Sequence, residues 1–431
     1  MRFVLDLLYL LAAAVISPAV VYRIIRQKRY HTGWGQRLGK ISRKNPQKKC
    51  IWLHAVSVGE VNAAKTIVKE LENRFPDFEI VISTITDTGF ARATAVFGQR
   101  LQVFYFPLDF SWIVTRAFRN IHPSLCLLME LEIWPNFVQT ARLLNVPVVV
   151  VNGRISDKSF AAYRKISGIA KKIFRNVTLI LAQTDQYAQR FAQIGCQSER
   201  IIVTGSLKYD TAEVTDKAEG ADTLAAQLNI ENEKLWVAGA TGNDEEKIIL
   251  DVYRKLQQQE QFRNLRLVIV PRKPERFNEV ARLIEQAGFP LIRYSKIKEQ
   301  GSPPKTDSRT VILGDTMGDL RKFYSLAAII FVGRSLVPMG GSDMAEAAAV
   351  GKPTLFGPHT FNFKQTVDAL LADDGAVMVK DEQALLEAMQ KCLLDSSFAA
   401  QIAGSGRAVI KKNQGATART IDQIEKFLNP A

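Results

Sequence analysis

The sequence predicts an α/β protein with two doubly wound parallel-sheet domains behind an N-terminal apolar helix. Short β-rich apolar runs alternate with amphipathic stretches of about 10–15 residues, which is typical of βαβ units, and the alternation occurs twice along the chain. The helix is predicted by residues 3–22, which carry one charge, Asp6. A composition of 47% hydrophobic and 23% charged residues excludes a disordered chain, a collagen and a multi-span membrane protein.

The N-terminal region combines an apolar segment with dense positive charge. Residues 1–22 are expected to form an anchor helix, because about 20 helical residues span a bilayer core. Residues 23–49 hold ten Lys and Arg and no acidic residue, so they carry +10 of the net charge of +14. This order predicts a membrane anchor beside anionic headgroups, with the rest of the chain on the cytoplasmic side. A cleaved signal peptide and a buried core helix remain alternatives, and the helix could span the bilayer or lie in its interface.

The first alternation assigns residues 50–212 to one Rossmann-like domain. Its expected strands lie at residues 50–54, 78–84, 101–106, 124–129, 147–151 and 178–183, with helices between them, and the run ends with RIIVTGSLKYD at residues 200–210. Residues 213–232 are polar and read as a linker with a short helix.

The second alternation assigns residues 233–431 to a similar domain. Its expected strands lie at residues 235–241, 265–271, 310–315, 327–333, 352–357 and 376–380, and the last 40 or so residues look helical. Doubly wound sheets bind ligands at the carboxyl ends of their strands, so the polar motifs that follow the strands are the candidate sites.

Metal and redox chemistry find little support in the residue types. The four cysteines lie far apart without a C-x-x-C pair, which excludes a local zinc ribbon or redox motif and favours a reducing compartment. There are only four histidines, and no D-x-D pair occurs to hold a metal against a nucleotide diphosphate. We therefore expect a reaction without a metal.

Three motifs follow strands of the first domain. Glu60 lies in the first turn of a helix, where the dipole favours its ionised form, and could act as a base on a hydroxyl or be a plain helix-start charge. Ser83 and Thr86 belong to a hydroxyl-rich turn that suits a phosphate or sugar, or an ordinary cap. Glu130 and Glu132 follow a buried strand, and the alternation of side chains along an extended chain places both carboxylates on one face. They could belong to a site or simply precede the start of the next helix.

Two motifs of the second domain suit a nucleotide. Arg272 and Lys273 lie just past a strand, where they could meet a phosphate. A glycine-rich turn then opens a helix and could cradle an anion, and an acid one turn in could bind ribose hydroxyls. These residues are Gly340, Gly341, Ser342, Asp343 and Glu346.

Taken in order, the motifs resemble those of the Kdo transferases. The matching segments are HAVSVGE, TxTxTG, MExExWPN, NxRxS, GSLKxD, PRxPERF and GPHTFNF, spread over nearly the whole chain. These enzymes move 3-deoxy-D-manno-octulosonic acid (Kdo) from CMP-Kdo onto the lipid A precursor. The resemblance implies a GT-B fold with a central cleft, an inverting reaction without metal or cofactor, and a place at the cytoplasmic face of the inner membrane.

The resemblance also implies a role for each matching residue. Glu60 would be the general base, and Glu132 an essential carboxylate on the acceptor side. The residues implied to line the substrates are Ser83, Thr86, Glu130, Arg154 and Lys208. Those implied to bind the CMP-Kdo donor are Arg272, Lys273, Gly340, Gly341, Ser342, Asp343 and Glu346.

The chain departs from the family pattern in three places. Leu131 stands between Glu130 and Glu132, where the family usually has a small hydroxyl residue. TPTG becomes TDTG at residues 86–89, and GGHNPLE becomes GGSDMAE at residues 340–346, which places an acid beside the expected phosphate. Three other functions remain open: another GT-B enzyme such as a nucleotide-sugar transferase or 2-epimerase, a non-catalytic membrane adaptor, and a membrane-tethered nucleic-acid binder. The last lacks a recognisable nucleic-acid module, so no nucleic-acid partner is expected.

Overall fold

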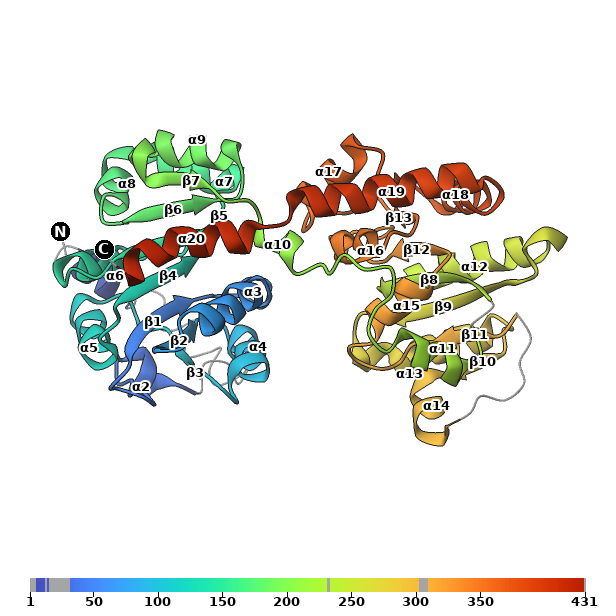
Figure 1. The fold of residues 1–431 in the computed structure, drawn as a ribbon, viewed down its shortest axis with the longest axis horizontal. Coiled ribbons are helices and arrows are strands. Elements are labelled where there is room, and N and C mark those ends of the chain that lie inside the picture. The colour runs from blue at the N-terminus through green and yellow to red at the C-terminus, as the bar shows by residue number, and fades with distance from the viewer. Residues whose placement is uncertain (1–4, 12–13, 15–31, 231–232, 302–308, 430–431) are drawn as a thin grey trace. The chain divides into compact units, whose positions relative to one another are not determined.

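The chain folds into two compact α/β units. The computed structural model describes residues 5–11, 14, 32–230, 233–301 and 309–429. Unit 1 contains the described residues up to Thr211 together with those from Gln414 onward, and unit 2 contains the residues between them. Each unit holds one seven-stranded sheet, and Figure 1 shows helices on both faces of each. The predicted pair of parallel-sheet domains is confirmed.

Unit 1 has the strand order β3-β2-β1-β4-β5-β6-β7, with every pair parallel. Its strands are β1 (Lys49–His54), β2 (Phe78–Thr84), β3 (Gln102–Tyr105), β4 (Leu125–Met129), β5 (Val148–Gly153), β6 (Leu179–Ala182) and β7 (Ile201–Val203). Its helices are α2 (Trp34–Arg37), α3 (Val58–Arg74), α4 (Asp87–Phe97), α5 (Ser111–Ile121), α6 (Pro135–Leu143), α7 (Asp157–Lys165), α8 (Ser167–Phe174), α9 (Asp185–Gln193), η1 (Ser198–Arg200), α10 (Leu207–Asp210) and α20 (Ala416–Leu428).

Unit 2 has the order β10-β11-β9-β8-β12-β13-β14, again parallel throughout. Its strands are β8 (Lys234–Thr241), β9 (Leu265–Pro271), β10 (Leu291–Arg293), β11 (Val311–Leu313), β12 (Ile329–Val332), β13 (Thr354–Phe356) and β14 (Val377–Met378). Its helices are α11 (Ala221–Leu228), α12 (Glu245–Gln257), η2 (Glu260–Phe262), η3 (Pro274–Arg276), α13 (Phe277–Gln286), α14 (Tyr294–Gln300), α15 (Leu320–Leu326), α16 (Met344–Ala349), α17 (Lys364–Ala372), α18 (Glu382–Leu394) and α19 (Ser396–Asn413).

The strand order reverses once in each sheet. In unit 1 the reversal lies between β1 and β4, and in unit 2 it lies between β8 and β12. Loops diverge to opposite faces at such a switch point, so a crevice opens beyond the carboxyl ends of the two strands. The fold therefore marks residues 55–60 and 130–134 in unit 1, and 242–246 and 333–343 in unit 2, as the places for sites.

Continuous apolar runs form the central strands because helices bury both faces of each sheet. Every residue of β4 is buried, and its side chains divide between two cores. Cys126 and Leu128 pack with Trp52 on one face, and Leu125 and Leu127 pack on the other.

The C-terminal boundary differs from the prediction. Residues 233–431 were expected in one domain, but α20 packs against α3 and α10 of unit 1, and Figure 1 labels it among the elements of that unit. Ile421 and Ile424 enter the unit 1 core, and Arg74 pairs with Asp422 at 2.9 Å. Amphipathic periodicity shows that a helix has an apolar face but does not show which sheet that face will cover. We therefore predicted α20 in the same domain as the helices that precede it in the chain.

Residues 32–49, predicted as part of a basic juxtamembrane segment, belong to unit 1, and two of their arginines are buried in it. The Arg43 guanidinium lies 2.7 Å from the Glu79 carboxylate, and both side chains are almost fully buried. Arg37 is also buried, over the ring of Tyr105. These two charges are therefore not available to lipid headgroups, and the remainder of the predicted segment, residues 23–31, lies outside the described residues.

Only part of the predicted anchor lies within the described residues. Residues 5–11 are helical, and no helix in the described part of the chain is long and apolar enough to cross a bilayer. The Asp6 carboxylate is buried against unit 1, where it accepts hydrogen bonds from the backbone N–H of Ser111 (2.8 Å) and from Asn136 Nδ2 (3.0 Å).

Two buried carboxylates cap helices that cannot cap themselves. The N-cap residues of α5 and α6 are Phe110 and Trp134, which offer no side-chain acceptor. The Asp6 carboxylate accepts a hydrogen bond from the first backbone N–H of α5, at Ser111. The Asp109 carboxylate accepts hydrogen bonds from the backbone N–H groups of Asn136 (3.0 Å) and Phe137 (2.8 Å) at the start of α6. Burial raises the pKa of Asp109 to about 7, against the lowering effect of those hydrogen bonds.

Candidate functional site

The unit 1 switch point brings together three glutamates. Glu60 lies in the first turn of α3, just beyond β1, while Glu130 and Glu132 follow the neighbouring strand β4. The carboxylates of Glu130 and Glu132 are close enough to Glu60 to raise its pKa by charge repulsion. The sequence motifs that were predicted to share one sheet edge therefore do so.

Glu60 is held by the start of its own helix. Ser57, the N-cap of α3, donates its hydroxyl to Glu60 Oε1 at 2.8 Å, and the backbone N–H of Val56 donates to Oε2 at 2.9 Å. This is a variant of the capping box, so the helix-start interpretation of Glu60 is correct as far as it goes. A carboxylate can accept about four hydrogen bonds, so both oxygens retain room for a proton.

The pKa of Glu60 differs from that of an exposed carboxylate at a helix start. Burial raises its pKa to about 7, with a further contribution from the charges of Glu130 and Glu132, while the two hydrogen bonds oppose the rise. A carboxyl group that titrates near neutral pH is suited to take a proton from a hydroxyl, because efficient general bases have pKa values near the working pH.

Glu130 and Glu132 reach the site through a turn. Alternation along an extended strand was predicted to place them on one face, but Glu130 has a φ of +54° and begins a turn. Its backbone N–H donates to Val151 O at 2.9 Å, which ties the turn to β5. Glu132 accepts a hydrogen bond from Trp134 Nε1 at 3.2 Å, and burial raises its pKa, with a contribution from Glu130.

Ser83 is placed inside the sheet. Its side chain is fully buried, accepts a hydrogen bond from Trp52 Nε1 at 2.8 Å and lies 2.9 Å from His54 Nδ1. Burial lowers the pKa of His54 to about 3, so this imidazole is neutral. In this geometry Ser83 fixes the ends of β1 and β2, and a contact with substrate stays untested.

The other predicted substrate residues of unit 1 lie at the same carboxyl edge. Thr86 is the N-cap of α4 and donates its hydroxyl to Val56 O at 2.9 Å, next to the loop that holds Glu60. Arg154 directly follows β5, and Lys208 lies in α10, whose first N–H (Leu207) donates to Asn152 Oδ1 of β5 at 3.1 Å. The side chains of Arg154 and Lys208 are partly exposed.

The unit 2 switch point is organised by a glutamate that the sequence analysis did not single out. Glu245 is fully buried at the start of α12, and its carboxylate accepts four backbone N–H bonds. The donors are Gly242 (3.1 Å), Arg334 (2.5 Å), Ser335 (2.7 Å) and Leu336 (2.9 Å). One side chain thus fastens the loop after β12 to the end of β8. In the sequence it looked like an ordinary acid at a helix start.

The glycine-rich loop comes shortly after residues 334–336, which Glu245 binds. Gly340 and Gly341 have φ values of +88° and +78°, and a Cβ on Gly340 would lie 2.1 Å from Asn362 Nδ2. The loop path therefore requires glycine at these two positions.

The two residues that follow the glycines, Ser342 and Asp343, already have hydrogen-bond partners at the start of α16. Asp343 accepts the backbone N–H of Ala345 at 3.0 Å, and Ser342 donates its hydroxyl to Ala240 O at 3.2 Å. The predicted anion cradle at this helix start is thus filled by Asp343. An anion placed there would meet a carboxylate, which favours a phosphate position nearer to Arg272.

Glu346 and Arg272 lie close together. Burial raises the pKa of Glu346, reinforced by Asp343 and opposed by the positive charges of Arg321 and Arg272. Arg321 Nε lies 3.8 Å from the Glu346 carboxylate. Arg272 and Lys273 are exposed just beyond β9, where a ligand could reach them.

Arg276, which belongs to the PRxPERF motif together with Arg272 and Lys273, has a structural role. Its guanidinium donates two hydrogen bonds to the buried Glu246, at 2.6 and 3.2 Å, and two to Glu279, at 2.7 and 3.3 Å. Across the described residues, no group of three or more His, Cys, Asp and Glu side chains is arranged to hold a metal ion.

Known proteins share this sequence and this fold. A family described as 3-deoxy-D-manno-octulosonic-acid transferase (kdotransferase) matches residues 32–211. The 3-deoxy-D-manno-octulosonic acid transferase of Haemophilus influenzae is 34% identical over 432 residues, which cover 99% of each chain. The enzyme of the same name from Bordetella pertussis is 31% identical over 445 residues, which cover 97% of this chain and 99% of the relative.

Solved structures agree on the fold at low sequence identity. A glycosyltransferase from Rickettsia africae matches with a TM-score of 0.57 at 14% identity and covers 89% of this chain and all of its own. A UDP-GlcNAc 2-epimerase from Neisseria meningitidis matches with a TM-score of 0.56 at 13% identity, with 88% of this chain and 100% of its own covered. At these identities the likeness concerns the fold alone.

Proposed function

Because the chain belongs to the 3-deoxy-D-manno-octulosonic acid (Kdo) transferase family, we propose that it moves Kdo from CMP-Kdo onto the lipid A precursor lipid IVA. The observation that carries this proposal is Glu60, a buried carboxyl group with a pKa of about 7 at a topological switch point, beside two further carboxylates. The site then supplies a base where an acceptor hydroxyl would bind.

In the proposed reaction the acceptor hydroxyl attacks the anomeric carbon of Kdo while Glu60 takes its proton. The bond between that carbon and the CMP phosphate oxygen breaks, and its electron pair leaves with CMP. Attack opposite the leaving group inverts the anomeric centre. Glu132 would orient the acceptor, because its carboxylate is fixed by Trp134. Among the other predicted residues of unit 1, Thr86, Glu130, Arg154 and Lys208 would line the acceptor or the Kdo carboxylate.

On the donor side, Arg272 would stabilise the charge that develops on the departing phosphate. Glu346 would accept hydrogen bonds from the ribose, and Lys273 would add positive charge near the nucleotide. CMP is a sufficiently good leaving group that no acid need protonate it, and Glu60 already serves as the proton acceptor. We therefore propose a reaction that needs neither a metal nor a cofactor.

A pH–rate profile tests the role assigned to Glu60. The base must be ionised to act, so kcat/KM should rise about tenfold per pH unit below the pKa of about 7 and level off above it. The measurement is initial transfer rates between pH 5.5 and 8.5 under kcat/KM conditions, with CMP affinity measured at each pH as a control. A profile that is flat across this range, with unchanged CMP affinity, would remove Glu60 from the role of base.

We also propose that the protein works at the cytoplasmic face of the inner membrane. The helical residues 5–11 support this proposal because they combine a docked carboxylate with exposed apolar side chains. Leu7, Leu8 and Leu11 are 58%, 55% and 58% exposed, while Asp6 holds the same segment on unit 1. Such a helix could lie in the interface and present a lipid-anchored acceptor to the site.

Replacing Leu7, Leu8 and Leu11 together with serine should weaken binding to phosphatidylglycerol-containing vesicles by at least about tenfold, because each apolar side chain loses transfer free energy. Flotation assays measure the bound fraction. The matched control is Leu394→Ser, which changes a leucine that is 62% exposed in unit 2. Equal binding by the triple variant and the control would show that this segment does not mediate attachment.

A further inference from the structure

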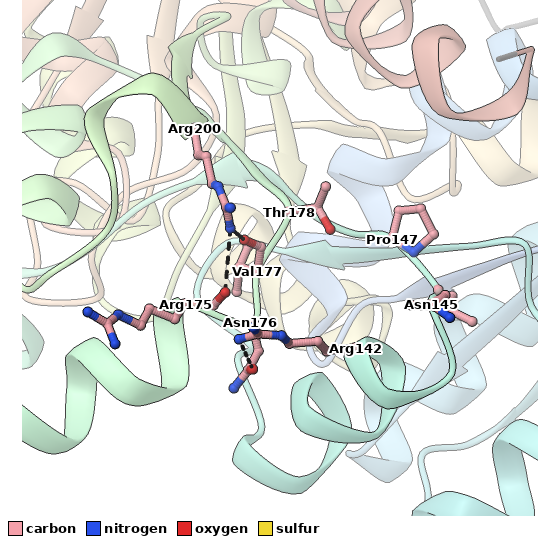
Figure 2. A pocket seen from close by; sticks show the side chains of 9 residues that line it. Arg142, Asn145, Pro147, Arg175, Asn176, Val177, Thr178 and Arg200 are labelled. Carbon is pink, nitrogen blue, oxygen red and sulfur yellow. Dashed lines mark hydrogen bonds between the residues drawn. The ribbon is translucent and has the colours of Figure 1, made fainter.

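A polar hollow lies at the end of the unit 1 sheet opposite to the three glutamates. It has a volume of about 400 Å³ and is lined where the chain enters β5, β6 and β7, at their amino ends. Its polar lining consists of Arg142, Asn145, Arg175, Asn176, Thr178 and Arg200 (Figure 2). None of the described residues that line it is acidic, so the hollow is a concentration of positive charge remote from the proposed reaction.

Three separate elements supply the arginines. Arg142 comes from the last turn of α6, Arg175 is the C-cap of α8, and Arg200 ends η1. Figure 2 shows Arg142 and Arg200 reaching toward the loop at Asn176 and Val177, whereas Arg175 extends away from it. Convergence of side chains from distant parts of the sequence on one hollow is what a binding site requires.

The arginines of the hollow keep most of their hydrogen-bonding capacity. Arg142 donates to Asn176 Oδ1 at 3.2 Å, and Arg200 donates from one nitrogen to Val177 O at 3.3 Å and to Arg175 O at 3.5 Å. Within the described residues none of the three forms an ion pair with a carboxylate. A guanidinium has five N–H donors, so Arg142 and Arg200 are positioned by neutral acceptors while further donors remain for a ligand.

The neighbouring hydroxyl adds a donor. Thr178 Oγ1 accepts the backbone N–H of Val148 at 3.0 Å, which leaves its own proton free to point toward the hollow. Guanidinium groups beside hydroxyl and amide donors match the oxygens of a phosphate, which they can bind in bidentate fashion.

We infer that this hollow binds the phosphate group of a phosphate ester, at a site separate from the proposed donor and acceptor sites. The group can come from a soluble phosphate compound or from a lipid headgroup. The exposed Leu143 and Leu144, next to Arg142, are suited to the apolar part of a lipid.

The test compares two double variants that lose the same charge from the same region. Arg142→Gln with Arg200→Gln removes the converging guanidinium groups, and Lys171→Gln with Lys172→Gln removes two exposed lysines from α8. The full-length protein is titrated with inorganic phosphate by calorimetry, with excess CMP present to fill the proposed donor site. It is also floated with phosphatidylcholine vesicles with and without phosphatidylglycerol.

We expect the arginine pair to weaken binding by at least about tenfold in one or both assays, and the lysine pair by less than about twofold. An effect on vesicles alone identifies a lipid headgroup, and an effect on inorganic phosphate identifies a soluble phosphate. The inference is overturned if the arginine pair loses no more binding than the lysine pair in either assay. If the arginine pair melts lower than the wild type, Arg142→Gln alone carries the test, because it keeps the Arg200 contacts.

Discussion

Replacing Glu60 with glutamine is expected to lower the rate of Kdo transfer by about 10³-fold while CMP affinity stays unchanged, because a general base contributes roughly 10²–10⁴-fold. Glutamine has nearly the same shape and can still accept a hydrogen bond from Ser57 or Val56, so the start of α3 is preserved. The variant therefore removes the proton acceptor without removing the cap.

The same variant should be more stable than the wild type at alkaline pH. The pKa of Glu60 is raised on folding, so the folded state binds this proton more tightly than the unfolded chain, and the contribution of Glu60 to stability falls as pH rises from about 4.5 to 7. A shift of this size corresponds to an upper bound of about 3 kcal/mol at pH 8. Glutamine carries no such penalty, and the difference should vanish near pH 4.

Denaturant unfolding at pH 4 and pH 8, together with the transfer rate, measures both effects. The matched control is Asp77→Asn, which neutralises an exposed carboxylate in the same unit and should alter neither quantity. A Glu60→Gln protein that transfers Kdo at the wild-type rate would contradict the role of Glu60. A protein that is less stable than the wild type at pH 8 would contradict the account of its pKa.

Replacing Glu245 with alanine should destabilise unit 2 by about 3–5 kcal/mol and weaken CMP binding. The substitution leaves four backbone N–H groups without their acceptor, and each buried unsatisfied donor costs about 1–3 kcal/mol, partly recovered when water enters the space. Three of the four donors, Arg334, Ser335 and Leu336, belong to the loop that leads to the glycines of the proposed donor site. That loop should detach before the rest of the unit unfolds.

Hydrogen–deuterium exchange over residues 333–341 tests this expectation directly, alongside calorimetric titration with CMP. The control is Glu285→Ala, which removes an exposed carboxylate from α13 and should change stability by less than about 0.5 kcal/mol. Unchanged protection of the Arg334, Ser335 and Leu336 amides in Glu245→Ala would show that Glu245 does not hold the loop.

The sequence predicted features that depend on local pattern. Apolar runs located the central strands, because a parallel sheet buried on both faces needs them continuously apolar. Strand ends then located Glu60 and Glu132 at one edge, because parallel strands share their carboxyl side. The strand order could not be read this way, and it is the order that brings β1 beside β4 and so places Glu60 near Glu132.

Features that depend on distant partners were missed. Glu245 resembles any acid at a helix start until β12 is placed beside β8. Ser83 was predicted in a hydroxyl-rich turn suited to a phosphate or sugar, but its hydroxyl contacts Trp52 and His54 inside the sheet. Arg43 was counted as free positive charge because its partner Glu79 lies 36 residues away. Charge counts and periodicity describe a segment by itself and carry no information about which partner it will meet.

The most direct test of the account is a transfer assay in the presence of a chelator. Purified full-length protein in detergent is mixed with freshly generated CMP-Kdo and a tetraacylated lipid A precursor, with EDTA and no added metal, and the lipid products are read by mass spectrometry. We predict stepwise additions of Kdo mass to the lipid, absent with Glu60→Gln. No Kdo addition by folded protein that binds CMP would contradict the proposed reaction, and addition that is lost on chelation would contradict its independence of metal.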